Sequence, residues 1–112
     1  MRLILLNAFP VNAIPFERFT ALFKRTSIEE LTRDVATASE VLCYIRHPAT
    51  VLALQSALNV PLKPSAELYR YREHDLIYVI TLKLPQRGQE VSEVKLEDLD
   101  LLKVVVVSGA WI

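Results

Sequence analysis

The sequence predicts a single α+β domain, of mixed α/β character, in which a central mixed β-sheet carries flanking helices. At 112 residues, 52% of them hydrophobic, the chain can bury one core but is too short for two ordinary domains. Strand-like and helix-like segments alternate in its first half. Two neighbouring strand-like segments follow in its second half, a pattern typical of an antiparallel hairpin. We therefore predict one domain over residues 1–112.

The first element is the uninterrupted apolar run of residues 3–6, which is typical of a strand covered on both faces. We place this strand in the centre of the sheet and end it at Asn7. Residues 8–15 contain two prolines that break helix and sheet ladder, so they form a loop at the carboxyl end of the strand. Residues 16–25 mix aromatic, threonine and charged residues, which favours a strand and leaves a short helix open.

The next segment begins with a helix signal. Ser27 and Glu30 have the spacing of a capping box, in which each side chain satisfies the other's free backbone amide. Residues 28–36 continue with helical apolar spacing and are predicted as a helix. Residues 40–45 are apolar and partly β-branched, but are too few to distinguish a strand from a helical turn.

The clearest helix begins at His47-Pro48, because a proline in the first turn loses no helical hydrogen bond. Asn59, just before Val60-Pro61, ends this helix. Helical spacing predicts a buried stripe that consists of Val51, Leu52, Leu54 and Leu58.

The second half of the chain predicts mostly strands. Residues 67–72 alternate in character and residues 76–84 form a second apolar run, so we predict that they pair as a hairpin. A polar loop follows over residues 85–90. Residues 96–102 are compatible with a short acidic helix, and the β-branched residues 103–107 with a last strand.

Composition excludes several classes of function. Thirteen acidic and thirteen basic residues balance, so no global positive field attracts nucleic acid or an anionic membrane. The apolar run at residues 3–6 is too short for a signal peptide or a membrane span. Cys43 is the only cysteine, so the chain cannot form an intrachain disulfide. We therefore expect a cytoplasmic protein without a membrane association, in which Cys43 is a buried apolar thiol.

Cofactor and metal chemistry also lack their usual residues. His47, His74 and Cys43 have none of the spacings typical of zinc sites, so we expect no metal site. Two glycines, Gly88 and Gly109, cannot build a phosphate-binding glycine loop, and we expect no cofactor. The chain has no Gly-x-Ser-x-Gly turn, which argues against a serine nucleophile.

Tyr69 and Tyr71 interleave with Arg70 and Arg72, which allows two interpretations. Aromatic rings stack on bases and arginines hold phosphates, so the four residues fit a nucleic-acid platform. They equally fit a plain strand in which the arginine stems lie along an apolar surface.

The most chemically suggestive residues surround the start of the second helix. His47 precedes Pro48, beside the unpaired amides and the positive dipole end of the helix, where a phosphate is attracted. Arg46 adds a charge and Thr50 a hydroxyl, so the segment is a candidate anion site that contains a titratable group. The alternative is a histidine that only caps or packs against the helix end.

The chain resembles the viral type III anti-CRISPR ring nucleases and their cellular relatives, over most of its length. Four features in order carry the resemblance. They are Leu6-Asn7-Ala8-Phe9 with Asn12 after the first strand; His47 three residues before Thr50 at a helix start; the strand Ile77-Tyr78-Val79-Ile80; and Arg87 before Glu90 in the following loop.

The resemblance implies that His47 is the key catalytic residue and that Glu90 assists it. It implies a homodimer that binds cyclic tetra-adenylate on its two-fold axis, closed over by the loop of residues 84–91, with no other stable protein partner. The apolar residues 104–107 and Trp111 are compatible with such a dimer. The substrate-binding residues that we carry over or add are Asn7, Asn12, Arg46, Thr50, Thr81 and Arg87.

The chain also departs from the family pattern. Arg46 stands where the family often has glycine, Pro48-Ala49 replaces more polar residues, and Ser65-Ala66 replaces a common Asn-Arg pair. Arg46, Lys63 or Arg70 are the candidates to replace the lost phosphate contacts. The loop before Glu90 is about two residues longer than usual in the family, so Glu93 is the alternative assisting acid, and Glu90 can also be a plain surface carboxylate.

These residues imply a reaction that needs no metal. RNA carries its own nucleophile, so a nuclease can orient a ribose 2′-hydroxyl for attack on the adjacent phosphorus and leave a 2′,3′-cyclic phosphate. A protonated His47 would donate a proton to the departing 5′-oxygen, and Glu90 would favour that protonated form. The competing hypotheses are a module that only binds nucleotide or nucleic acid, and a purely structural protein. Ring size and viral or cellular origin stay open.

Overall fold

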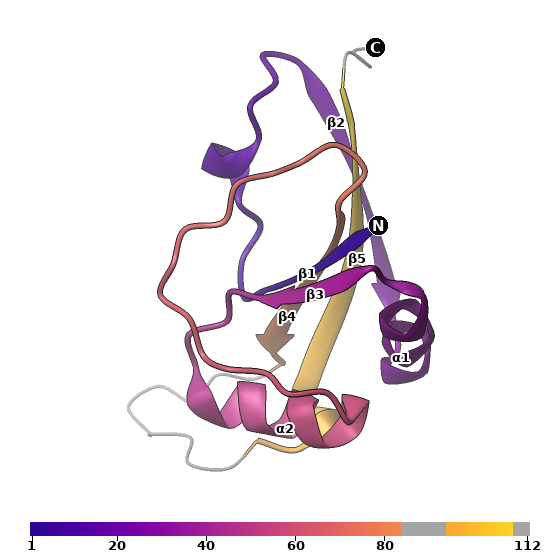
Figure 1. Cartoon of the computed structure of the whole chain (residues 1–112), viewed down its shortest axis with the longest axis vertical. Coiled ribbons are helices and arrows are strands. Elements are labelled where there is room, and N and C mark those ends of the chain that lie inside the picture. Colours follow the sequence, from indigo (N-terminus) through magenta and orange to yellow (C-terminus); the bar gives the residue numbers. More distant parts are fainter. Residues whose placement is uncertain (84–93, 109–112) are drawn as a thin grey trace.

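The computed structural model describes residues 1–83 and 94–108, and these form an α+β fold as predicted. Five strands make one mixed sheet in the order β2-β5-β4-β1-β3, and two helices complete the described part. The strands are β1 (Arg2–Leu6), β2 (Phe19–Thr26), β3 (Glu40–Cys43), β4 (Leu76–Leu82) and β5 (Leu99–Ser108); the helices are α1 (Ile28–Thr37) and α2 (Pro48–Leu58) (Figure 1).

Strand β1 is paired on both sides, although the middle strand of the sheet is β4 and not β1 as predicted. It pairs in parallel with β3 on one side and with β4 on the other. Leu3, Ile4 and Leu5 are fully buried, because both faces of the strand are covered, as the uninterrupted apolar run predicts.

Strands β4, β5 and β2 form the antiparallel part of the sheet. The prediction of a hairpin between residues 67–72 and 76–84 is wrong, because β1 and β5 occupy both edges of β4. The short acidic helix predicted over residues 96–102 is a single 3-10 turn, Leu96–Asp98, after which β5 begins at Leu99. Of the open segments, 16–25 contains most of strand β2, which extends to Thr26, and 40–45 contains strand β3.

Both helices pack against one face of the sheet. Leu31 of α1 and Val51 and Leu54 of α2 join Leu3 and Leu5 of β1 in one apolar cluster. The stripe predicted for α2 is correct except at Leu52, which is 63% exposed. Its place in the buried set is taken by Thr50, because the buried face begins one turn before Leu54.

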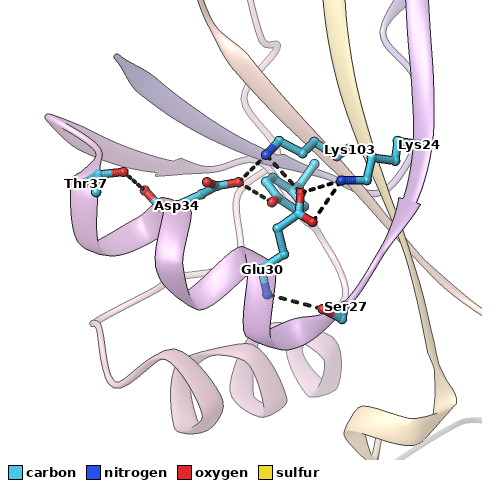
Figure 2. A network of polar contacts seen from close by, with 7 residues as sticks. Lys24, Ser27, Glu30, Asp34, Thr37 and Lys103 are labelled. Carbon is cyan, nitrogen blue, oxygen red and sulfur yellow. Dashed lines mark hydrogen bonds and ion pairs between the residues drawn. The ribbon is translucent and has the colours of Figure 1, made fainter.

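A polar network fixes α1 on this face (Figure 2). Ser27 caps the helix by accepting a hydrogen bond from the Glu30 amide at 3.2 Å. The Glu30 carboxylate does not complete a capping box with Ser27 but pairs with Lys24 and Lys103, at 3.0 and 2.9 Å, and these lysines lower its pKa to about 2. Lys103 also pairs with Asp34, at 2.8 Å. The network therefore ties α1 to β2 and β5.

Loops cover the opposite face of the sheet. Ile14, Tyr69 and Tyr71 pack there on residues of β1, β4 and β5. Because β3 and β4 both run parallel to β1, the segment between α2 and β4 leads the chain back from the carboxyl ends of these strands to the amino end of β4 (Figure 1). On this return path it lies extended without joining the sheet, and it buries Tyr69 and Tyr71 while Leu68 is 83% exposed.

Candidate functional site

The candidate site lies at the edge of the sheet where three parallel strands end. Because β1, β3 and β4 run in the same direction, their carboxyl ends meet at one edge. Asn7 follows β1, and Thr81 lies near the end of β4. The Tyr44 amide donates to the Leu5 carbonyl at 2.8 Å, which holds the segment after β3 beside β1 as it leads to His47. Such edges are the usual ligand sites of open sheets.

A cleft of about 960 Å³ opens beside this edge, on the loop-covered face. One wall is formed by the loop after β1, which includes Asn7 and Asn12, and the other by the extended segment after α2. Arg46 also lines it. The structure therefore brings together three predicted ligand residues from two separate parts of the sequence.

The two walls are fixed to each other and to the sheet. The Tyr71 amide donates to the Ala13 carbonyl at 3.1 Å, and the Phe16 and Tyr71 rings meet edge-on with centroids 5.7 Å apart. Tyr44 and Tyr69 both line the cleft, and their ring centroids lie 5.4 Å apart. These contacts make the cleft a preformed feature of the fold.

Asp75 holds in place the cleft wall that the extended segment after α2 forms. This residue is 4% exposed and accepts four hydrogen bonds, from Arg2 Nε at 2.8 Å, Arg2 Nη2 at 2.6 Å, the Tyr69 hydroxyl at 2.5 Å and the Arg72 amide at 3.0 Å. Burial alone would raise the pKa of its carboxyl, but these donors together lower it. Asp75 therefore remains ionised and ties residues 69–72 to β1.

The charges that line the cleft favour an anion. Arg46 and Arg70 both line it, and neither guanidinium has a hydrogen bond or ion pair with any residue that the structure describes. Glu67 is the acidic residue in the lining. Two guanidinium groups without a partner among the described residues, together with aromatic rings and the Asn7 and Asn12 amides in the same lining, suit a ligand with phosphates and bases.

His47 occupies the N-cap of α2, directly after Arg46, and does not itself line the cleft. Its Nδ1 accepts a hydrogen bond from the Thr50 amide at 3.3 Å and lies 3.0 Å from the Thr50 hydroxyl. Its Nε2 has no hydrogen-bond partner within residues 1–83 and 94–108. The ring is thus oriented by the helix through one nitrogen and keeps the other available.

The remaining predicted residues are less central or lie elsewhere. Thr50 is 4% exposed and contacts His47 instead of the cleft. Thr81 is exposed and pairs in register with Asp100 of β5, outside the cleft lining. Arg87, Glu90 and the alternative acid Glu93 lie outside the described residues, as does Trp111.

Sequence reasoning missed several residues of the site. Tyr44 and Glu67 were not singled out, and Asp75 falls between the two strands of the predicted hairpin. The alternating pattern of residues 67–72 indicated Tyr69 and Arg70, but it arises from a segment that lies across the face of the sheet and not from a strand. An aspartate directly before a buried strand is a second signal, since a buried carboxylate requires a partner.

Other chemistry has little support in the described part of the chain. Residues 1–83 and 94–108 contain no group of three or more metal-ligating side chains. Burial raises the pKa of the Cys43 thiol, which disfavours the thiolate needed for nucleophilic attack. Within those same residues, no helix is long and apolar enough to cross a bilayer.

No protein-family model matches the sequence, and no curated protein matches it. Its fold is similar to the structure of B116 of Sulfolobus turreted icosahedral virus, with a TM-score of 0.71 over 93% of this chain and 98% of that one. The two sequences are 15% identical, so the likeness establishes the fold alone.

Proposed function

We propose that this protein is a metal-independent ring nuclease that cleaves cyclic tetra-adenylate and thereby antagonises or terminates type III CRISPR signalling. The observation that carries the proposal is the position of His47. Its ring is held by the N-terminus of α2, its Nε2 is free of partners in the described chain, and the preceding residue, Arg46, lines a cleft suited to phosphates.

The reaction uses the substrate's own nucleophile. A ribose 2′-hydroxyl attacks the adjacent phosphorus, the bond to the 5′-oxygen breaks, and that oxygen takes a proton from His47. The products are linear oligoadenylates that end in a 2′,3′-cyclic phosphate. The protein contributes orientation, charge stabilisation and the proton, and none of these roles requires a metal ion.

The cleft offers the contacts that a cyclic oligonucleotide needs. Arg46 and Arg70 supply the phosphate contacts that the chain lacks at Ser65-Ala66, where the resembled family commonly has an Asn-Arg pair. Asn7 and Asn12 supply amides for base or ribose groups. A homodimer would present two copies of this half-site to a ring that is itself two-fold symmetric.

The fold likeness to B116 supports an origin in a virus of prokaryotes, with the cytoplasm of the host as the place of action. It does not by itself favour catalysis over binding. The experiment therefore has to separate these two roles.

The test is incubation with cyclic tetra-adenylate, followed by chromatography of the products and a separate measurement of ligand affinity. His47→Ala should retain most of the affinity and lose about 10²–10⁴-fold in single-turnover cleavage. His47→Asn is the sharper variant, because asparagine is a good N-cap and keeps an acceptor for the Thr50 amide but cannot transfer a proton. His74→Ala is the matched control, since the His74 side chain is 87% exposed and lies beside Glu73, away from the N-terminus of α2.

The two competing hypotheses predict other results. If His47 were only a helix cap, His47→Asn would cleave at the wild-type rate. Tight binding without cleavage by the wild type would identify a binding module, and absence of binding to any cyclic oligoadenylate would favour a structural protein. Glu90→Gln should reduce cleavage less than His47→Ala, because it removes the partner of the proton donor and not the donor itself.

A further inference from the structure

The contact between His47 and Thr50 determines which ring nitrogen can carry a proton. A backbone N–H can only donate, so the Thr50 amide at 3.3 Å requires a lone pair on Nδ1. In the neutral ring at rest, the single proton is therefore on Nε2.

Proton transfer through Nε2 needs a different arrangement. An imidazolium that gives up its Nε2 proton leaves the neutral ring protonated on Nδ1, and a ring that accepts a proton at Nε2 must already carry one on Nδ1. Every state on either path thus has an Nδ1–H, which needs an acceptor. The Thr50 amide cannot accept, whereas the Thr50 Oγ1 lies 3.0 Å from Nδ1 and can.

We propose that Thr50 is a positioning residue whose hydroxyl accepts the Nδ1–H of His47 during proton transfer, and that it is not a ligand contact. The inference rests on the proposed function, because it concerns how His47 delivers its proton. Burial supports it: Thr50 is 4% exposed and belongs to the buried face of α2. The hydroxyl therefore serves the ring and not the substrate.

The hydroxyl can fill both roles because its proton rotates. At rest it shares Nδ1 with the amide as a second donor. When Nδ1 is protonated, the same oxygen turns its lone pair to the ring, and His47 keeps one orientation throughout. Without the hydroxyl, Nδ1 faces only the amide donor and the ring is held in the tautomer that cannot pass a proton through Nε2.

Thr50→Val tests this directly, because valine has the same shape and keeps the backbone amide. We expect single-turnover cleavage of cyclic tetra-adenylate to fall by ~10²-fold or more, within the contribution of a general acid. Ligand affinity should stay within about twofold of the wild type, and Thr50→Ser should restore most of the rate. Thr32→Val is the matched control, since the Thr32 hydroxyl bonds only the Ile28 carbonyl on the exposed side of α1.

A spectroscopic readout keeps this test independent of activity. At acidic pH, where the ring is doubly protonated, the Hδ1 proton of His47 should give an NMR resonance protected from exchange in the wild type and in Thr50→Ser, and lost in Thr50→Val. If the wild type failed to cleave the ring, the proposed function would fall while this readout still decided the role of Thr50. Wild-type cleavage by Thr50→Val, or an unchanged Hδ1 resonance in it, would overturn the inference.

Discussion

The Asp75 carboxylate is the point at which stability and the cleft are most closely linked, and Asp75→Asn probes both. The substitution preserves the shape of the side chain but removes its charge. Arg2, whose side chain is 16% exposed, then loses both charge-assisted hydrogen bonds to that carboxylate, at 2.8 and 2.6 Å.

The magnitude follows from that burial. Removing one partner of a buried ion pair typically costs 3–5 kcal/mol, and the partial exposure of Arg2 places this case at the lower end, at about 3 kcal/mol. For a domain of this size the loss corresponds to a fall in Tm of about 12 °C. Asp75 also accepts hydrogen bonds from the Tyr69 hydroxyl and the Arg72 amide, so the cleft wall formed by the extended segment after α2 should loosen. The affinity for cyclic tetra-adenylate should therefore fall.

Urea and thermal unfolding followed by circular dichroism measure the effect, with Glu73→Gln as control, because the Glu73 side chain is 78% exposed. The pH dependence gives a second check. The pKa of Asp75 is lowered in the folded protein, so its contribution is present above the usual aspartate range and is lost as the pH falls below about 4. Asp75→Asn should flatten that part of the stability curve. An unfolding midpoint equal to the wild type would refute the reasoning.

Three further predictions concern the proposed reaction, the assembly and the helix anchor. Cleavage should survive excess EDTA, since the mechanism uses the 2′-hydroxyl and His47; activity that is lost on chelation and restored by a divalent cation would contradict it. Light scattering at micromolar concentration should give a dimer mass, to which the exposed apolar Leu22, Val105 and Val107 can contribute, and a monomer mass would count against the two-fold site. Lowering the pH from about 4.5 to about 2 should remove the stability that Glu30 gains from Lys103 and Lys24, because the pKa of Glu30 is lowered through that range. Glu30→Gln should be less stable than the wild type at neutral pH, and its stability should not change with this titration.

Elements whose signals are local were predictable from the sequence. The buried strand β1 follows from four consecutive apolar residues, and the bounds of α2 follow from Pro48 and from Asn59, which takes a left-handed conformation at φ 54°. The same reasoning placed His47 at a helix N-terminus. Each of these features depends on residues within one turn or one strand.

Features set by tertiary pairing were not predictable. Residues 67–72 have the alternation of a strand, yet an alternating segment gains the same burial by lying across a sheet face as by joining its edge. The parallel partner of β4 is 73 residues away in the chain, and no local pattern indicates it. Leu52 has an apolar side chain, but helix packing turned that position to solvent and buried Thr50.

The site was predictable in part for the same reasons. Asn7 and Asn12 were expected after the first strand and Arg46 at the start of the second helix, and all three line the cleft. Its second wall could not be foreseen, because it depends on the path of residues 67–71 and on the Asp75 network. Thr50 was assigned as a ligand contact from its place in the first turn of the helix and from the family resemblance, whereas its burial became visible only once α2 was packed.

The pairing of β2 with β5 has a consequence for how the chain folds. In the described chain β2 has no other strand partner, and even the nearest pair of this ladder, Thr26 and Leu101, is 75 residues apart. Closing a loop of that length costs about 4 kcal/mol of chain entropy before the ladder forms. A topology with such distant contacts folds in the range of milliseconds to seconds, more slowly than a helical bundle of equal size. Until β5 is in place, Leu22 and its neighbours on β2 remain an unpaired strand open to intermolecular association.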